Sequence, residues 1–214
     1  MVSITKISQS GASPRRRTVH FDGAYDPVVT SRQALEAATI VVGDTFETID
    51  EFSDRLLAVE RAAAMQRAFD IISRREVSRA MMERRLRDDG YSSDAVTAVI
   101  DRIVDLGYLD DLRFARLVWR AEDGAYRGRS RVVQKLRAAG VDPQVIDAAE
   151  SECRADGDLR DPLETARVLA TRLGAPFSDR SARQKAIRRL VSKGFPLEIA
   201  IRACDGSDLD GDLG

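Results

Sequence analysis

The chain has little of what builds a large β domain, a membrane span or an exported protein. Aromatic residues make up only 6% of its 214 residues and only six are proline, which argues against a large all-β domain. No apolar run approaches the roughly 20 residues that a membrane-spanning helix needs, and the N-terminus lacks the apolar core of a signal peptide. We therefore expect a mainly helical, cytoplasmic protein without a membrane partner.

Residues suited to metal binding or nucleophilic catalysis are also scarce. The two cysteines, Cys153 and Cys204, lie far apart without metal-ligand spacing, which suits reduced structural thiols. The single histidine, His20, has no cysteine or serine partner in its pattern, and no phosphate-binding G-x-x-x-x-G-K-[ST] loop is present. We predict a protein that is not an enzyme, with no catalytic residue, no metal and no cofactor.

One group of carboxylates allows a different interpretation: Asp101, Asp105, Asp110 and Asp111. Paired acids of this kind could hold Mg²⁺ for a metal-dependent nuclease. However, Asp110 falls where a helix needs an N-cap, and Asp111 falls in the first turn, where negative charge suits the helix dipole. Helix capping is the interpretation that we favour.

The charges nearly cancel over the whole chain. There are 34 basic residues against 35 acidic ones, and only four of the basic residues are lysine. This balance argues against a protein that simply coats nucleic acid, although it can hide local asymmetry.

Residues 1–48 predict an N-terminal extension and a small α+β subdomain. We expect the first 20 residues to be mobile. Thr18–Phe21 and Tyr25–Val29 are expected to form short extended segments about an Asp22-Gly23 turn, because Asp-Gly favours the positive φ angles of a tight hairpin. Pro27 then confines the second segment to a sheet edge.

A short helix is expected to follow this hairpin. Thr30 or Ser31 can cap a helix over Arg32 to Ala38, because their hydroxyl groups accept a hydrogen bond from the first turn.

From about Asp50 to Cys204 the apolar residues recur at helical spacing, and the pattern repeats. Arg79–Val99, Arg129–Ala149 and Arg183–Ala203 align on a glycine, with leucine four residues before it and a large apolar residue directly after it. The three glycines lie roughly 50 residues apart: Gly90, Gly140 and Gly194. Glycine ends a helix in the left-handed conformation, and the apolar residue after it folds back on that helix.

Another helix is expected before each of these pairs, so the unit has three helices and occurs three times. We place the repeats at residues 49–109, 110–157 and 158–204, with an acidic, disordered tail at 205–214. Short helices cannot bury their apolar stripes alone, so the repeats should stack into an elongated, curved array. The alternative is three unrelated helical hairpins in one globular bundle.

Basic residues occur at equivalent places in the three repeats. The second repeat has Arg127, Arg131 and Lys135 at a spacing of four, which we expect to share one helix face. Such runs usually face solvent, but three equivalent runs favour an anionic partner. The predicted partner contacts are Arg127, Arg131, Lys135, Arg137, Lys185, Arg188, Arg189, Arg84 and Arg85.

Two aromatic residues could contribute to binding. Trp119 and Tyr126 could stack on bases, but we expect Trp119 to pack between helices of adjacent repeats.

Several motifs together resemble the central signature of the RecX family, bacterial regulators of the RecA recombinase. They are Gly107–Ala115, Arg127–Arg131, Lys135-Leu136 and Gly140-Val141. Outside this centre, Ser78–Leu86 is similar to the start of the family's first repeat and Arg188–Phe195 to its last.

The resemblance implies three tandem three-helix repeats that bind along the groove of the RecA filament on DNA. It implies a monomer that modulates, mostly by inhibition, the ATPase, strand exchange and co-protease activity of RecA in DNA repair and the SOS response. Direct contact with nucleic acid is left open. The alternative function is a stand-alone helical DNA-binding protein, which would bind bare DNA tightly and with a steep salt dependence.

Overall fold

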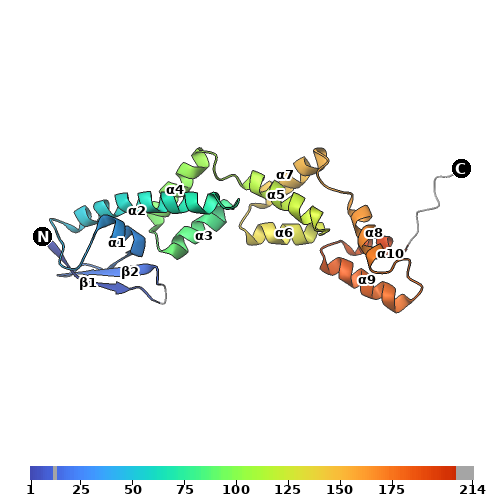
Figure 1. The fold of residues 1–214 in the computed structure, drawn as a ribbon, viewed down its shortest axis with the longest axis horizontal. Helices are drawn as coiled ribbons and strands as arrows, with labels where there is room; N and C mark the ends of the chain where they lie inside the picture. Colours follow the sequence, from blue (N-terminus) through green and yellow to red (C-terminus); the bar gives the residue numbers. More distant parts are fainter. Residues whose placement is uncertain (12–13, 206–214) are drawn as a thin grey trace. The chain divides into compact units, whose positions relative to one another are not determined.

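The computed structural model describes residues 1–11 and 14–205, which contain ten helices and four short strands. The chain divides into two compact units, Met1–Asp110 and a second that begins at Asp111 (Figure 1). The predicted fold class, mainly α with a small N-terminal β element, is confirmed. No helix of the described part is long and apolar enough to cross a membrane. The predicted acidic tail lies outside the described residues, apart from Asp205.

The N-terminal strands form one antiparallel sheet in the order β3-β2-β1-β4. The strands are β1 Val2–Gln9, β2 Arg16–Phe21, β3 Val28–Ser31 and β4 Thr45–Phe46. The prediction of a mobile first segment was therefore wrong, because β1 pairs with both β2 and β4 and buries Val2 and Ile4. Strands β2 and β3 do pair, with Gly23 at φ +74° between them and β3 at the sheet edge. The second segment was predicted too early, because β3 begins at Val28, so residues 22–27 form a longer loop rather than a tight Asp22-Gly23 turn.

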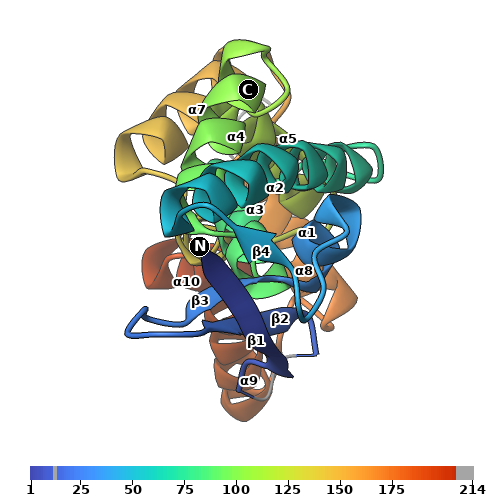
Figure 2. The same cartoon turned by 90° about the vertical axis from the view of Figure 1, so that its left-hand side faces the viewer.

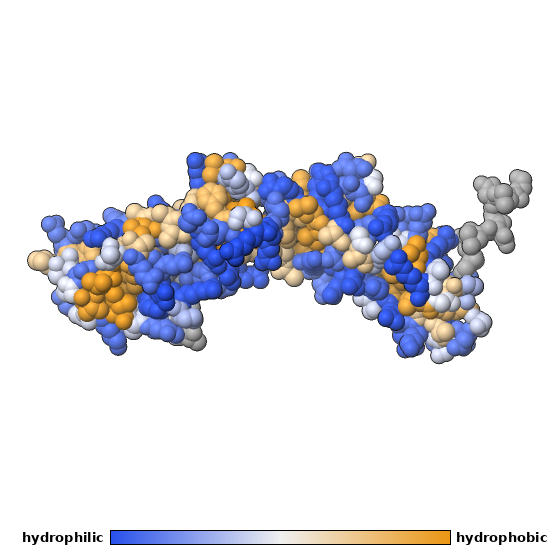
Figure 3. Space-filling model, in the orientation of Figure 1, coloured by the Kyte–Doolittle hydropathy of each residue, from blue (hydrophilic) through white to orange (hydrophobic). Residues whose placement is uncertain are grey.

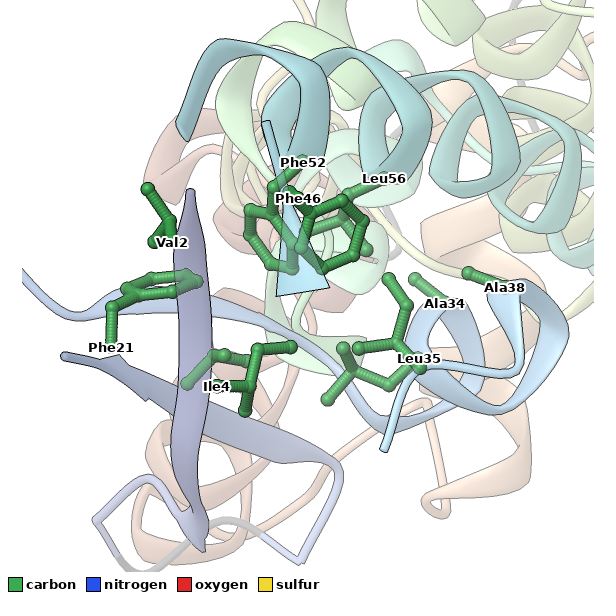
Figure 4. Close-up of a cluster of buried hydrophobic side chains, with 11 residues drawn as sticks. Val2, Ile4, Phe21, Ala34, Leu35, Ala38, Phe46, Phe52 and Leu56 are labelled. Atoms are coloured by element: carbon green, nitrogen blue, oxygen red, sulfur yellow. The ribbon is translucent and has the colours of Figure 1, made fainter. Parts of the chain in front are cut away.

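Two helices cover one face of this sheet (Figure 2). The predicted short helix is confirmed as α1, Arg32–Ala38, and the Ser31 hydroxyl accepts a hydrogen bond from the Ala34 amide. Helix α2, Ile49–Ile72, is capped in the same way by Thr48. The ring of Phe52 on α2 meets Phe21 and Phe46 edge-on, with centroids 4.9 and 5.2 Å apart. Figure 4 shows these side chains pointing into one apolar cluster with Ile4 and Leu35.

Helices α2 to α10 form three groups of three. The first group is α2 with α3, Arg79–Asp89, and α4, Ser93–Asp105. The second is α5, Asp111–Gly124, α6, Arg129–Ala138, and α7, Pro143–Ala155. The third is α8, Pro162–Arg172, α9, Arg180–Ser192, and α10, Leu197–Asp205.

Each group has an apolar core of its own. Met82, Leu86 and Ile103 are central to the first core, Leu136 and Ile146 to the second, and Leu190 and Phe195 to the third. Three separate cores of this kind fit three repeats, and they contradict the alternative of a single bundle with one shared core.

The second helix of each repeat ends as the glycine pattern predicts. Gly90, Gly140 and Gly194 have φ values of +102°, +77° and +100°. The amide of the residue after each glycine then donates to the carbonyl oxygen of the leucine four residues before the glycine. The bonds run from Tyr91 to Leu86, from Val141 to Leu136 and from Phe195 to Leu190, at 3.1 to 3.2 Å. These bonds satisfy carbonyl groups that the helix end would otherwise leave unpaired.

Two buried carboxylates join the sheet to the first repeat. Asp89, 6% exposed, pairs with Arg15 from the sheet side and with Arg67 of α2, whose Nε lies 2.7 Å from Oδ2. Glu60 on α2 is 2% exposed and accepts hydrogen bonds from the Thr30 hydroxyl at 3.1 Å and from the Ser92 amide at 3.1 Å. Strand β3 and the N-terminus of α4 therefore meet at one carboxylate.

Replacing this carboxylate should lower stability. Glu60→Leu keeps a similar volume but leaves the Thr30 hydroxyl and the Ser92 amide without their acceptor, so we expect the free energy of unfolding to fall by about 2 kcal/mol. Urea unfolding followed by circular dichroism would measure the change. Asp54→Leu is the matched control, because Asp54 is an exposed carboxylate on the same helix, and should change stability by less than about 0.5 kcal/mol. Equal effects of the two substitutions would contradict the role of Glu60.

Candidate partner-binding surface

A backbone contact locks the second and third repeats together. The Gly128 amide donates to the Lys193 carbonyl oxygen at 3.0 Å, and the Ser130 amide and hydroxyl donate to the Gly194 carbonyl oxygen at 3.2 and 2.8 Å. A Cβ on Gly128 would lie 2.2 Å from the carbonyl carbon of Gly194, so the contact requires glycine. We call this contact the glycine clasp. It places the start of α6 against the end of α9.

Tyr126, beside the glycine clasp, strengthens the same junction. Its backbone has φ +56°, which is uncommon for a residue with a side chain. Its ring contacts two guanidinium groups, with Arg160 at 4.5 Å and Arg172 at 4.6 Å from the ring centroid. Arg160 is also 3.5 Å from the Asp123 carboxylate. The ring and its two cations therefore tie the α5–α6 loop to α8 and to the loop before it.

The glycine clasp gathers four cations, which we call the α6–α9 basic cluster: Arg127, Arg131, Arg189 and Lys193. Burial, and then the positive charges of Arg127 and Arg189, lower the pKa of the Lys193 ammonium group. A Cβ on Gly194 would lie 2.7 Å from the Cβ of Arg131, which places that side chain at the same junction. Within residues 1–11 and 14–205, no ion pair neutralises any of the four.

The predicted face of α6 needs two corrections. Arg127 does not lie on α6, because the helix begins at Arg129 with Gly128 as its N-cap. Lys135 does lie on α6, but its ammonium group is 2.5 Å from the Glu122 carboxylate of α5 and is largely neutralised. Arg131 is therefore the member of that predicted row that lies on α6 and also stays exposed without an ion pair among the described residues.

The other predicted contacts are exposed and are divided between the two units. Arg137 lies in the last turn of α6, and Lys185 and Arg188 lie on α9. Arg84 and Arg85 lie on α3 in the first unit, and Arg85 is 3.7 Å from the buried Asp89 carboxylate.

The sequence prediction missed Lys193. It follows Arg189 by four residues, the spacing that places side chains on one helix face, and Arg189 follows Lys185 by the same interval. That continued spacing is the signal that could have found it.

The structure shows what surrounds the residues that suggested catalysis, which are the aspartates near the start of α5 and His20. Helix α5 begins at Asp111, which puts Asp110 in the N-cap position. Among the described residues, no group of three or more His, Cys, Asp or Glu side chains is arranged to hold a metal ion. His20 does meet a serine, contrary to the sequence pattern, because β1 and β2 pair and bring its Nε2 to 3.3 Å from the Ser8 hydroxyl. No carboxylate hydrogen-bonds to this ring within the part of the chain that the structure describes.

The two candidate aromatic residues are both engaged. Trp119 is 3% exposed and packs inside its own repeat, where its Nε1 donates to the Ile146 carbonyl oxygen at 3.3 Å. It also lines a small cavity with Thr165 and Phe195 of the third repeat, so the expectation that it packs between adjacent repeats is met only in part. The Tyr126 ring already contacts two arginines, Arg160 and Arg172, which leaves little room for a stacked base.

These features define a class of protein: a tandem three-helix repeat protein with an exposed cationic cluster at a repeat junction. The family model of the first three-helix domain of RecX matches residues 64–102. The chain is 32% identical over 126 residues to the regulatory protein RecX of Trichlorobacter lovleyi, covering 58% of this chain and 79% of that protein. It is 34% identical over 148 residues to that of Xanthomonas axonopodis pv. citri, covering 68% and 88%.

The chain belongs to the RecX family of regulatory proteins. Two solved structures share its fold. A crystal structure of regulatory protein RecX aligns with a TM-score of 0.60 at 20% identity, over 93% of this chain and 97% of that one. The structure of RecX from Lactobacillus salivarius aligns with a TM-score of 0.60 at 21% identity, over 68% and 95%.

Proposed function

We propose that this protein is a non-enzymatic modulator of RecA, mostly an inhibitor, that binds along the RecA filament on DNA. Through this binding it regulates the ATPase, strand exchange and co-protease activity of RecA. Membership of the RecX family supports the regulatory role. The observation that carries the binding site is the α6–α9 basic cluster, four cations that the glycine clasp holds together without a neutralising carboxylate among the described residues.

A repeat protein suits a filament because each contact raises the effective concentration for the next. Several weak contacts can then give strong binding without any deep pocket. A regulator that binds one state of the filament better than another shifts the filament toward that state, even though it has no catalytic group of its own. The proposed mechanism therefore needs an exposed, pre-organised surface rather than an active site.

Charge reversal in the cluster should weaken regulation of RecA. We expect Arg127→Glu/Arg189→Glu to raise the concentration needed for half-inhibition of the RecA ATPase on single-stranded DNA by tenfold or more, since roughly 1.4 kcal/mol of lost binding energy is tenfold in affinity. Arg180→Glu/Arg202→Glu is the matched control, because both are exposed cations of the same unit outside the cluster. It should inhibit like the unmodified protein.

Two results would count against the proposal. If the cluster variant is folded, as its melting curve would show, and inhibits normally, the cluster is not the RecA contact. If the unmodified protein leaves the RecA ATPase unchanged at every concentration, the proposed function itself is wrong.

The same four cations would also suit a stand-alone DNA-binding protein. That alternative predicts tight binding to bare DNA, whose log–log salt slope falls by about one unit for each lost phosphate contact. Binding of labelled single-stranded DNA without RecA, measured over a range of salt, separates the two. If inhibition disappears only in proportion to bare-DNA binding across the variants, the alternative holds.

A further inference from the structure

A second arginine-rich site lies in the first unit, between α2 and α3. It is an open hollow of about 400 Å³ that we call the α2–α3 hollow. Its lining comes from the end of α2, the loop after it and the outer face of α3: Arg67, Asp70, Ile71, Arg74, Arg75, Val77, Met81, Met82, Arg84, Arg85 and Asp88. Figure 3 shows strongly hydrophilic residues over this end of α2 and over α3.

The helical spacing explains how these residues meet. Arg67 and Ile71 are four residues apart, so they share one face of α2, and Arg74 lies in the turn directly after the helix. Met81, Arg84 and Arg85 likewise share one face of α3. The two faces look into the hollow, with apolar side chains at its floor and cations at its rim.

The cations of the rim differ in how they are neutralised. Arg67 is held by the buried Asp89 carboxylate at 2.7 Å, and Arg85 is 3.7 Å from the same group. Arg74, Arg75 and Arg84 are exposed, and none of them has an ion pair with any residue in 1–11 or 14–205. The hollow therefore offers three uncommitted guanidinium groups around an apolar floor.

We propose that the α2–α3 hollow binds an acidic segment of a partner protein that carries one apolar side chain. Guanidinium groups bind carboxylates through paired, charge-assisted hydrogen bonds. The floor of Ile71, Val77, Met81 and Met82 provides a place for a leucine-like side chain, and methionine adapts well to such a contact. This site is distinct from the α6–α9 basic cluster, and the inference goes beyond the proposed function.

The composition of the hollow favours a peptide over a nucleic-acid strand. Its lining contains no aromatic residue on which a base could stack. Asp70 and Asp88 stand among the arginines and would repel a continuous row of phosphates, whereas a peptide can offer them backbone amide donors. A peptide with separate carboxylates on either side of an apolar side chain matches this alternation of positive and negative charges in the lining.

Binding of short fluorescent peptides to the purified full-length protein, without RecA or DNA, tests the proposal. The array would permute aspartate, glutamate and leucine, and would include forms with asparagine for aspartate and serine for leucine. We expect acidic leucine-containing peptides to bind, and either replacement to weaken them. Arg74→Glu/Arg84→Glu should weaken the best peptide by roughly tenfold or more, because it removes charge-assisted hydrogen bonds and adds repulsion of the carboxylates.

Arg61→Glu/Arg102→Glu is the matched control, since both are exposed arginines of the same unit outside the hollow. It should leave peptide binding unchanged. Met81→Gln, which keeps the length of the side chain, should weaken the leucine peptides but not their serine forms. The proposal is overturned if no peptide binds in a manner that depends on Arg74 and Arg84, or if a short single-stranded oligonucleotide does so instead. Either result leaves the test on the RecA ATPase untouched.

Discussion

Gly128→Ala is expected to separate the second and third repeats and to abolish most regulation of RecA. The added Cβ would lie 2.2 Å from the Gly194 carbonyl carbon, 2.3 Å from its oxygen and 2.4 Å from the Phe195 nitrogen. All three are backbone atoms, so no side chain can turn away to relieve the overlap. Overpacking of this kind usually costs about 1 to 3 kcal/mol, and the lost hydrogen bonds of the glycine clasp bring the expected loss to about 3 kcal/mol or more.

The chain contains a close control for this substitution. Gly124 ends α5 only four residues earlier, and a Cβ there would meet no atom within 4 Å. Gly124→Ala should therefore be neutral or stabilise by up to about 1 kcal/mol, because alanine restricts the unfolded chain. Thermal unfolding followed by the fluorescence of Trp119, the single tryptophan, reports on this unit.

The functional result of Gly128→Ala depends on what the glycine clasp does. If the glycine clasp holds Arg127 and Arg131 beside Arg189 and Lys193, Gly128→Ala should weaken inhibition of the RecA ATPase as well as lower stability. The weaker inhibition should be seen even at temperatures at which the helices of the variant remain folded. A folded Gly128→Ala protein with normal stability and normal inhibition would show that the two repeats need no such contact.

Asp89→Ala is expected to have the largest effect in the first unit. The Asp89 side chain is 6% exposed and pairs with Arg15 and Arg67, with Arg85 further away. Removing one partner from a buried ion pair leaves the other charges uncompensated, which typically costs about 3 to 5 kcal/mol. Arg15 and Arg85 are about half exposed and can turn toward water, so we expect the lower end, about 3 kcal/mol.

Asp88→Ala is the control for that substitution, because Asp88 is the neighbouring carboxylate but is exposed. It lies in the last turn of α3, where a negative charge opposes the helix dipole, so its loss should be neutral or slightly stabilising. Urea unfolding followed by circular dichroism compares the two. A loss below about 1 kcal/mol for Asp89→Ala would mean that the sheet is held to the first repeat without this pair.

The N-terminal subdomain could be predicted only in part from local features of the sequence. The short helix after Ser31 could be predicted because its cap is a local feature. Strand β1 could not be predicted in this way, because its partners β2 and β4 lie further along the chain. Val2 and Ile4 can be recognised as the buried side of an alternating strand only once these pairings are known.

The candidate partner surface could also be predicted from the sequence only in part. The sequence predicted Arg131 and Arg189, because helical spacing shows which side chains point away from the apolar stripe. It could not show that Glu122 of another helix neutralises Lys135, or that a contact between repeats brings the start of α6 against the end of α9.

The sequence by itself determined the helices, their ends and their repetition. Gly90, Gly140 and Gly194 end equivalent helices in the left-handed conformation, and this needs only the glycine and the apolar residue beside it. Only the tertiary structure decided what each of these three glycines packs against. Gly90 is buried against the sheet and Gly194 against the start of α6, while Gly140 is exposed. The reason is that close backbone approach depends on residues distant in sequence, such as Arg16 for Gly90 and Gly128 for Gly194.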